Sequence, residues 1–240
     1  MAARPLVSLV TGASSGFGAL TARVLARSGH RVYAGFLQSN DDQTSVYKDA
    51  ATFAKDNNCQ LQGIELNVVK DDSIRSAIDE IMANEGRIDV VVHNAAPYFA
   101  AKAAQDSLAQ TYALEISRFG IETSIIVPGV FTKGTNHFAT AMKAADTAVE
   151  KEYMEGVLKG WDQISAEGHD KIVSPDADPA AVAEAVCRVV STEHGKRPFR
   201  VHVEYDGGGA AIVSGVRDLV RETYLTKLGL ADLMKVKVFI

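Results

Sequence analysis

The 240-residue sequence has only two cysteines, and none of its apolar runs is long. Cys59 and Cys187 lie far apart, with no Cys or His at ligand spacing. This spacing excludes a disulfide framework and a zinc site, so we expect no metal. No run approaches the roughly 20 apolar residues that a membrane span needs, and the opening residues lack a signal-peptide pattern. These absences predict a cytoplasmic protein with no membrane partner.

Positive charge is also scarce, because 25 Lys and Arg residues face 30 Asp and Glu residues and the net charge is -5. Such a chain has no basic field to neutralise the phosphates of a nucleic acid, so we expect small-molecule partners and no nucleic acid. No repeat, low-complexity tract or Pro/Gly-rich linker divides the sequence. The length suits one hydrophobic core, which predicts a single domain over 1–240.

Short apolar runs alternate with helical segments along most of the chain. The expected strands are 6–10, 31–35, 61–66, 88–92, 122–127 and 199–203. The expected helices are 19–28, 45–57, 71–85, 98–119 and 179–190, and the tail from 219 is expected to form a helix and a short extended end. This alternation predicts an α/β fold with a doubly wound, Rossmann-type parallel sheet.

Two of these segments carry more specific expectations. The run 88–92 is apolar enough for a strand buried on both faces. For the helix 71–85, Asp71 or Asp72 is expected near the N-cap. Residues 132–174 carry apolar side chains at roughly helical intervals, which predicts a substrate-side lid segment whose helices cover one rim of the sheet.

Three glycines lie between the first expected strand and the first expected helix, in Thr11-Gly12-Ala13-Ser14-Ser15-Gly16-Phe17-Gly18. Glycines there let the backbone approach a pyrophosphate, and the start of the helix presents free N–H groups to it. A glycine-rich turn that only reverses the chain is the plain alternative, but the strand before and the helix after favour dinucleotide binding. The expected cofactor-binding residues of this loop are Gly12, Ser14, Ser15, Gly16, Phe17 and Gly18.

The spacing TGxxxGxG resembles that of the short-chain dehydrogenase/reductase family. Three further motifs follow in the order of that family: His93-Asn94-Ala95-Ala96 resembles its NNAG segment, Tyr98-Phe99-Ala100-Ala101-Lys102 its YxxxK motif, and Pro128-Gly129 with Thr132 its PGxxxT segment. The resemblance implies an NAD(P)-dependent oxidoreductase that moves a hydride between the nicotinamide and an alcohol or carbonyl carbon. It also implies cofactor contacts at Asn94, Ala95, Lys102, Pro128, Gly129 and Thr132.

The end of the second expected strand bears on the choice between NAD and NADP. Residues 34–38, Ala-Gly-Phe-Leu-Gln, contain no acid to bind the ribose hydroxyls of NAD, and no arginine follows to clamp a 2′-phosphate. We favour NADP over NAD, with Ser39 and Asn40 as hydrogen-bond donors to the 2′-phosphate. Asn67, beside Val68, matches the family position that holds the adenine amino group, and a simple turn residue is the alternative.

Tyr98 and Lys102 are spaced to share one face of a helix. A tyrosine with a pKa near ~10 exchanges protons poorly at neutral pH, and a neighbouring cation lowers that pKa. In the family, this Tyr is the general acid/base and this Lys also holds the nicotinamide ribose. The alternative is that Tyr98 packs at the junction of strand and helix while Lys102 is solvated.

The sequence departs from the family between Asn94 and Tyr98, where the family carries a long helix, a further strand and a catalytic serine. That helix also supplies a catalytic Asn and a dimer surface, and neither Ser107 nor Ser117 matches the missing serine. The fold is thus expected to be shortened by about one strand and one helix, and a homo-oligomer remains open. Either the sheet closes up by one strand, or apolar faces become exposed.

Three functions are compatible with these observations. The apolar side chains Phe138, Met142, Met154 and Trp161 suggest an apolar alcohol or carbonyl substrate, although an inner stripe that packs on the core is the alternative. His137 is expected on the surface or the lid. The rival to an active oxidoreductase is a shortened, dinucleotide-binding variant with weak or no activity. A methyltransferase that uses S-adenosylmethionine is the third candidate, but YxxxK and PGxxxT have no role in it.

Overall fold

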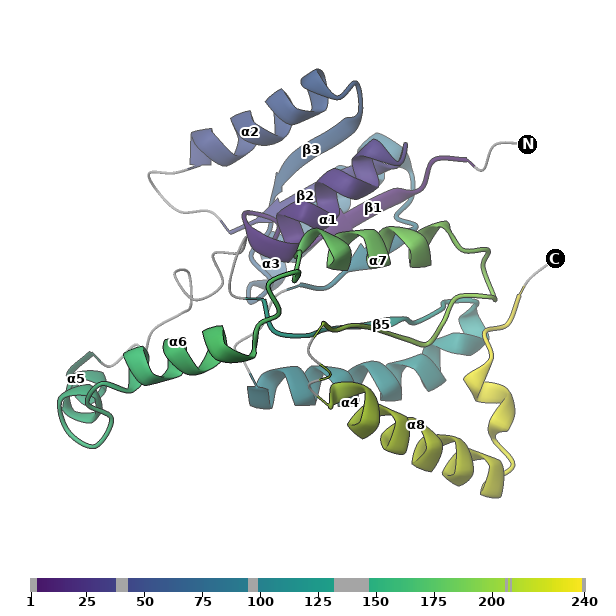
Figure 1. Ribbon diagram of the computed structural model, residues 1–240. Coiled ribbons are helices and arrows are strands. Elements are labelled where there is room, and N and C mark those ends of the chain that lie inside the picture. The colour runs from purple at the N-terminus through teal and green to yellow at the C-terminus, as the bar shows by residue number, and fades with distance from the viewer. Residues whose placement is uncertain are drawn as a thin grey trace.

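The structure is a computed structural model, and it describes residues 4–37, 43–94, 99–131, 147–205, 207 and 209–238. Strands and helices alternate, and the fold class is the α/β class with parallel strands that the sequence predicts (Figure 1). The strands are β1 (Val7–Val10), β2 (Arg31–Phe36), β3 (Gln60–Glu65), β4 (Val90–Val92), β5 (Ile125–Pro128) and β6 (Arg200–Val203).

The helices follow the expected order, and short 3-10 turns follow two of them. They are α1 (Gly16–Arg27), α2 (Gln43–Asp56), α3 (Asp71–Glu85), α4 (Phe99–Ile116), η1 (Ser117–Phe119), α5 (Thr147–Glu155), α6 (Trp161–Ile172), α7 (Ala180–Ser191), α8 (Ala210–Lys227) and η2 (Ala231–Met234). None of the helices in the described ranges is both long and apolar enough to cross a membrane.

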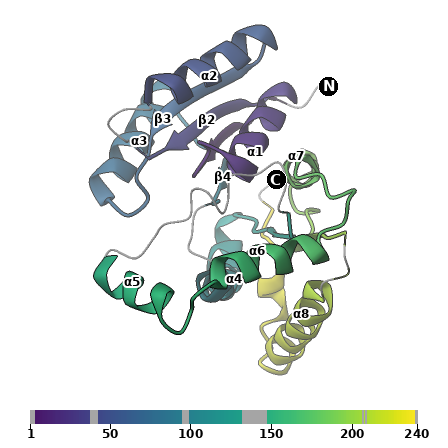
Figure 2. The ribbon, with the colours of Figure 1, turned by 60° about the vertical axis from the view of Figure 1, so that its left-hand side comes forward.

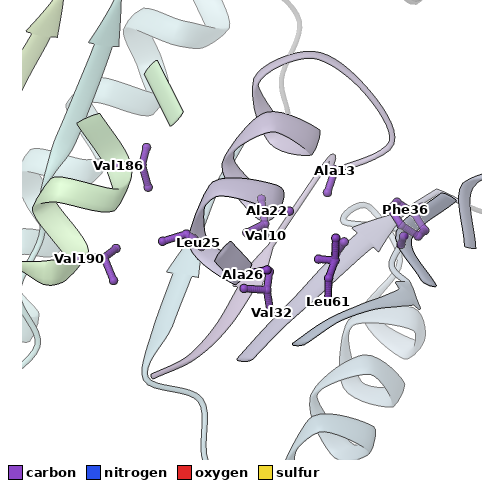
Figure 3. Packing of buried hydrophobic residues seen from close by; sticks show 12 residues of the cluster. Val10, Ala13, Ala22, Leu25, Ala26, Val32, Phe36, Leu61, Val186 and Val190 are labelled. Carbon is purple, nitrogen blue, oxygen red and sulfur yellow. The ribbon is translucent and has the colours of Figure 1, made fainter. Parts of the chain in front are cut away.

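The strands form two parallel sheets instead of one. The first has the order β3-β2-β1-β4, and the second pairs β5 with β6. Among the described residues, β4 and β5 each lie at the edge of a sheet, so the expectation that the sheet closes up by one strand is wrong. Packing of α7 along α1, and not hydrogen bonding between β4 and β5, holds the second sheet against the first (Figures 1 and 3).

The strand β4 is less buried than its apolar sequence predicts. Val91 is 46% exposed, and Val90 and Val92 are only half-buried. A strand buried on both faces needs covering layers and neighbours on each side, and among the described strands only β1 is hydrogen-bonded to β4. The expectation of a fully buried strand is therefore wrong, and the exposure of an apolar face, which was the other expected outcome, is found here.

The main hydrophobic core lies between the first sheet and the helices α1, α2 and α7. Leu25 of α1 is fully buried and points toward Val186 and Val190 of α7 (Figure 3). Val10 of β1 belongs to the same cluster. A second cluster on the opposite face of the sheet packs α3 against β1, β2 and β3. The central strand β1 is thus buried on both faces, which fixes the loop that follows it.

One helix start agrees with expectation and one differs. Lys70 is the N-cap of α3, and Asp71 and Asp72 lie near it in the first turn, as expected, where their charges suit the positive end of the helix dipole. The helix α8 begins at Ala210, well before the expected position 219. Its N-cap, Gly209, has a φ of 80°, a left-handed conformation that glycine adopts without strain and that reverses the chain after β6.

The helices α5 and α6 extend beyond the sheets to the left of Figure 1 and come forward in Figure 2. Neither has a buried residue, and Trp161 is 53% exposed. The alternative that Trp161 belongs to an inward-packing stripe is therefore wrong, while the lid over 132–174, of which the structure describes 147–174, stays a prediction. Most side chains of both helices are exposed. Phe138, Met142 and His137 lie outside the described residues.

Candidate functional site

The glycine loop joins β1 to α1 at the carboxyl edge of the first sheet. Hydrogen bonds to the neighbouring strands fix its start: Thr11 N donates to the carbonyl oxygen of Val92 at 2.9 Å, and Ala13 N to that of Gly35 at 2.9 Å. Gly12 has a φ of 61° and Gly16 a φ of 55°, and both values lie in the left-handed region that disfavours other residues. The sequence thus supplies glycine where the turn requires it.

The third glycine of the loop allows a close approach between segments. A Cβ atom on Gly18 would lie 2.3 Å from the carbonyl oxygen of Gly12 and 2.7 Å from Nδ2 of Asn94. Asn94 Nδ2 donates to that same carbonyl at 3.2 Å, and Asn94 N donates to Thr11 Oγ1 at 3.0 Å. Asn94, predicted from the NNAG-like segment, therefore lies directly against the glycine loop and helps to hold its shape.

The backbone N–H groups in the first turn of α1 have no side-chain cap and are available to a ligand. The N-cap residue, Ser15, makes no side-chain capping hydrogen bond, and no acidic residue lies in the first turn. Ser14 is exposed beside it. Unpaired N–H groups at a helix start, together with the helix dipole, favour an anion such as a phosphate.

Aromatic contacts bring the loops after β1, β5 and β6 together. The rings of Phe17 and Phe131 meet edge to face with their centroids 5.4 Å apart, and Phe131 meets Tyr205 at 5.9 Å. Gly129, which follows β5, donates its N–H to the carbonyl oxygen of Val203 at 2.8 Å. The predicted Pro128-Gly129 segment thus reaches the same edge as the glycine loop. No local motif marks Phe131 or Tyr205 in the sequence, because their ring contacts join segments that are distant along the chain.

Asn67 and Val68 follow β3 at this edge. Asn67 Oδ1 accepts a hydrogen bond from Val69 N at 3.1 Å, and Asn67 N donates to Ser73 Oγ at 2.9 Å. These bonds are those of a turn residue, which was the alternative to an adenine-binding role. The carbonyl oxygen of the side chain retains a second lone pair for a further donor.

Lys102 lies in the first turn of α4, while its predicted partner Tyr98 lies outside the described residues. Lys102 Nζ donates to Gln105 Oε1 at 3.3 Å. Desolvation by neighbouring protein atoms lowers the pKa of Lys102, although its side chain as a whole is exposed. The predicted residues Ala95, Thr132, Ser39 and Asn40 also lie outside the described ranges.

Neither serine of the α4 region takes the place of the missing catalytic serine. Ser107 is exposed, and the buried Ser117 donates its hydroxyl to the carbonyl oxygen of Leu114 at 3.0 Å. Over the part of the chain that the structure describes, no cluster of three or more His, Cys, Asp or Glu side chains is arranged to hold a metal ion. The described residues therefore offer neither a replacement for the missing serine nor a metal centre.

Comparison of the sequence with known proteins supports this description. Residues 6–97 match the family model described as short chain dehydrogenase. A 3-ketodihydrosphingosine reductase of Bacteroides thetaiotaomicron is 22% identical, and the alignment covers 83% of this chain and 88% of the relative. That alignment is 261 positions long, more than the 240 residues of the whole chain, so the relative contains segments that have no counterpart here. Relatives with 34% identity match 37% of this chain and only 34% of their own length.

Solved structures share the fold over most of the chain. A short-chain dehydrogenase from Streptomyces avermitilis has a TM-score of 0.62 and 23% identity, covering 94% of this chain and 98% of its own. A variant of the actinorhodin polyketide ketoreductase, crystallised with NADPH, has a TM-score of 0.62 and 18% identity over 86% of this chain and 98% of its own. The chain therefore has a Rossmann-type α/β fold. Its resemblance to the short-chain dehydrogenase/reductase family is confirmed.

Proposed function

We propose that this protein binds a nicotinamide dinucleotide at the carboxyl edge of β1 and transfers a hydride between the nicotinamide and an alcohol or carbonyl carbon. The observation that carries the proposal is the uncapped start of α1, in a glycine loop whose shape is held by the close approach of Gly12, Gly18 and Asn94. The family match over residues 6–97 covers this loop.

The residues at this edge fit the cofactor. The N-terminal turn of α1, with Ser14, Ser15, Gly16 and Phe17, would hold the pyrophosphate, because its N–H groups are uncapped and no carboxylate opposes an anion there. The proposed contacts to the rest of the cofactor come from Asn67, Val68, Asn94, Ala95, Lys102, Pro128, Gly129 and Thr132.

The proposed chemistry uses two side chains of the α4 region. The cofactor supplies or accepts the hydride, while Tyr98 gives a proton to the carbonyl oxygen or takes one from the alcohol. Lys102 lowers the pKa of the Tyr98 phenol through its positive charge and also binds the nicotinamide ribose. The position of Lys102 in the first turn of α4 supports this pairing, because Tyr98 immediately precedes the helix.

We propose NADP as the preferred cofactor and an apolar alcohol or carbonyl as the substrate. No acid stands at the end of β2, where an NAD-selective site has a carboxylate for the ribose hydroxyls. A structure with the same fold was crystallised with NADPH. The name of the 22% identical relative denotes a reductase of a ketone, and exposed apolar side chains such as Trp161 and Ile164 accompany the candidate lid.

The rival function is a dinucleotide-binding protein with weak or no activity. The observation that favours it is the edge position of β4, which leaves the sheet without the strand and serine that the family carries between β4 and α4. Such a chain would keep the glycine loop and the cofactor affinity while lacking a group to hold the substrate oxygen beside Tyr98.

A cofactor titration followed by a turnover assay tests both functions. We expect NADPH fluorescence to change on binding, with NADH weaker and S-adenosylmethionine inert, and we expect oxidation of the nucleotide when mixed aldehydes and ketones are added. Binding without turnover would select the inactive rival. Absence of binding by either nucleotide would refute the proposed function at its first step.

We also propose that the protein forms a homo-oligomer through the outward face of α8. The six apolar side chains of that face are 60% to 74% exposed, and they are Ile212, Val213, Val216, Leu219, Val220 and Tyr224. The row lacks the many Lys and Arg residues of helices that bind membrane surfaces, and the chain has a net charge of -5. A second copy, which presents the same uncharged row, is the partner that fits it.

Light scattering across a range of concentrations tests this interface. The parent should show at least twice the mass of one chain, and Val216→Lys should lower that mass because it places a charge within the apolar row. Val157→Lys is the matched control, since Val157 is also exposed but lies outside α8. A parent that keeps the mass of one chain at every concentration would contradict the proposal.

A further inference from the structure

A partly buried group of ion pairs joins α4, β6 and α8. The side chain of Arg200 is only 5% exposed, and its Nη1 atom donates to Asp106 Oδ1 at 2.5 Å. Its Nε and Nη2 atoms donate to the carboxylate of Asp218 at 2.8 and 2.9 Å. Arg217 of α8 also donates to Asp106. Asp106 is therefore held by two guanidinium groups that come from other elements.

These contacts stabilise the charged form of both central groups. Burial alone would raise the pKa of Asp106, but the hydrogen bond and charge of Arg200, with help from Arg217 and Gln110, lower that pKa below its ordinary value. The hydrogen bond to Asp218, opposed by burial and supported by Asp106, raises the pKa of Arg200. Asp106 therefore remains an anion that is fully engaged on the side of α4 that faces α8 and β6.

Asp106 and Lys102 are placed so that they would otherwise pair. They lie one helical turn apart on the same face of α4, the spacing at which opposite charges on a helix attract each other. Yet Lys102 Nζ contacts the neutral Gln105, and among the described residues no carboxylate lies within ion-pair distance of it. Asp106, the nearest carboxylate along the helix, is bound by Arg200 and Arg217.

We infer that Arg200 and Arg217 act as positioning residues, which capture Asp106 and so keep the ammonium of Lys102 free for Tyr98 and the nicotinamide ribose. The inference rests on the proposed function for its catalytic consequence, but the competition for Asp106 is independent of turnover. If both arginines were removed, Asp106 would pair with Lys102. The ammonium would be partly neutralised and would lower the pKa of Tyr98 less.

The charged groups around this site come from three elements. Arg217, Asp218 and Arg221 reach it from α8 and Arg200 from β6, while α4 itself carries Lys102 and Asp106. Arg221 lies over the ring of Phe199 at 4.3 Å. Burial lowers the pKa of Arg221, the charge of Asp218 opposes this lowering, and the charge of Arg200 adds to it. Asp218 is bound by Arg200, so the loss of Arg200 would release both carboxylates. Asp218 lies on α8, where its charge also acts on Arg221, whereas Asp106 lies one helical turn from Lys102 on α4. Asp106 is therefore the released carboxylate that is placed to pair with Lys102.

The test measures the basicity of Lys102 by competitive labelling with acetic anhydride at a series of pH values, with mass spectrometry of the peptide. In the variant Arg200→Met/Arg217→Gln, we expect the pKa of Lys102 to rise by about one unit, so that labelling at neutral pH slows about tenfold. Adding Asp106→Asn should restore the parent profile, because an amide cannot neutralise the ammonium. Asp106→Asn alone should leave the profile near that of the parent.

If the network had a purely structural role, Asp106→Asn would damage the protein as much as the loss of the arginines. It would then not restore the labelling profile of the arginine variant. An unchanged profile in the arginine variant, or no rescue by Asp106→Asn, would overturn the inference. If the double variant fails to fold, Arg217→Gln with and without Asp106→Asn tests the same competition with a smaller expected shift, because Arg200 still donates to Asp106. The side chain of Arg217 is 40% exposed and so tolerates replacement.

Turnover separates this inference from the proposed function. With an active parent, the midpoint of the pH profile for alcohol oxidation should move upward in the arginine variant and return with Asp106→Asn. An inactive parent whose Lys102 labelling still shifts would refute the proposed hydride transfer and leave the capture of Asp106 standing. An active parent whose arginine variant shows no labelling shift would support the proposed hydride transfer and overturn the capture of Asp106.

Discussion

Tyr98→Phe should lower kcat about 10²- to 10⁴-fold, the usual contribution of a positioned general acid or base. The phenyl ring keeps the shape of the side chain but has no proton to exchange with the substrate oxygen. Because the proposed pyrophosphate contacts lie at the start of α1, the affinity for NADPH should change little. Steady-state kinetics with the best carbonyl substrate, together with a fluorescence titration of NADPH, measure both quantities.

Tyr112→Phe is the matched control, since Tyr112 lies on α4, the helix that follows Tyr98 in the sequence, and is exposed. It should behave like the parent in both assays. If Tyr98→Phe turned over substrate as fast as the parent, the acid/base role of Tyr98 would be wrong, and the search for a proton donor would move to the other side chains of this edge.

Gly18→Ala should abolish tight cofactor binding, with an affinity loss of at least about 100-fold, or roughly 2.7 kcal/mol. The added Cβ would lie 2.3 Å from the carbonyl oxygen of Gly12, which is backbone and cannot move without reshaping the loop. The same Cβ would displace Asn94 from Gly12, so the loop would lose a hydrogen bond as well as its shape. Isothermal titration with NADPH and thermal melting measure the two effects.

Gly215→Ala provides the control for this substitution. Gly215 lies inside α8 with no atom within 4 Å of the Cβ position, so alanine should stabilise the helix by about 0.5–1 kcal/mol and leave cofactor binding intact. Should Gly18→Ala bind NADPH as tightly as the parent, the close approach of Gly12, Gly18 and Asn94 would have no part in binding.

The order of the elements could be read from the sequence because each depends on neighbours in the chain. The expected helix 71–85 coincides with α3, and Gly120 ends the α4 region in the left-handed conformation that glycine favours. The glycine loop was likewise identified from a strand before it and a helix after it. The contacts of Asn94 with this loop agree with its predicted place beside the glycines.

The candidate site was predictable only in part. The motif spacing indicated Asn94, Lys102 and Gly129 and could not indicate their partners. The aromatic contacts of Phe131 join three loops, and Asp106 and Arg200 are separated by 94 positions in the sequence. Such contacts depend on how β5, β6 and α8 pack against α4, and no periodicity in the sequence encodes that packing.

The sequence by itself determined the α/β class, the glycine loop and the absence of a segment between β4 and α4, because local periodicity, glycine conformation and motif spacing are properties of the chain. Only the tertiary structure decided how the strands of the shortened chain pair. The strand β4 stays at an edge, β5 and β6 pair separately, and contact between α1 and α7 joins the two parts. The physical reason is that strand pairing requires two backbones to meet at hydrogen-bonding distance, and side-chain packing between distant helices determines whether they do.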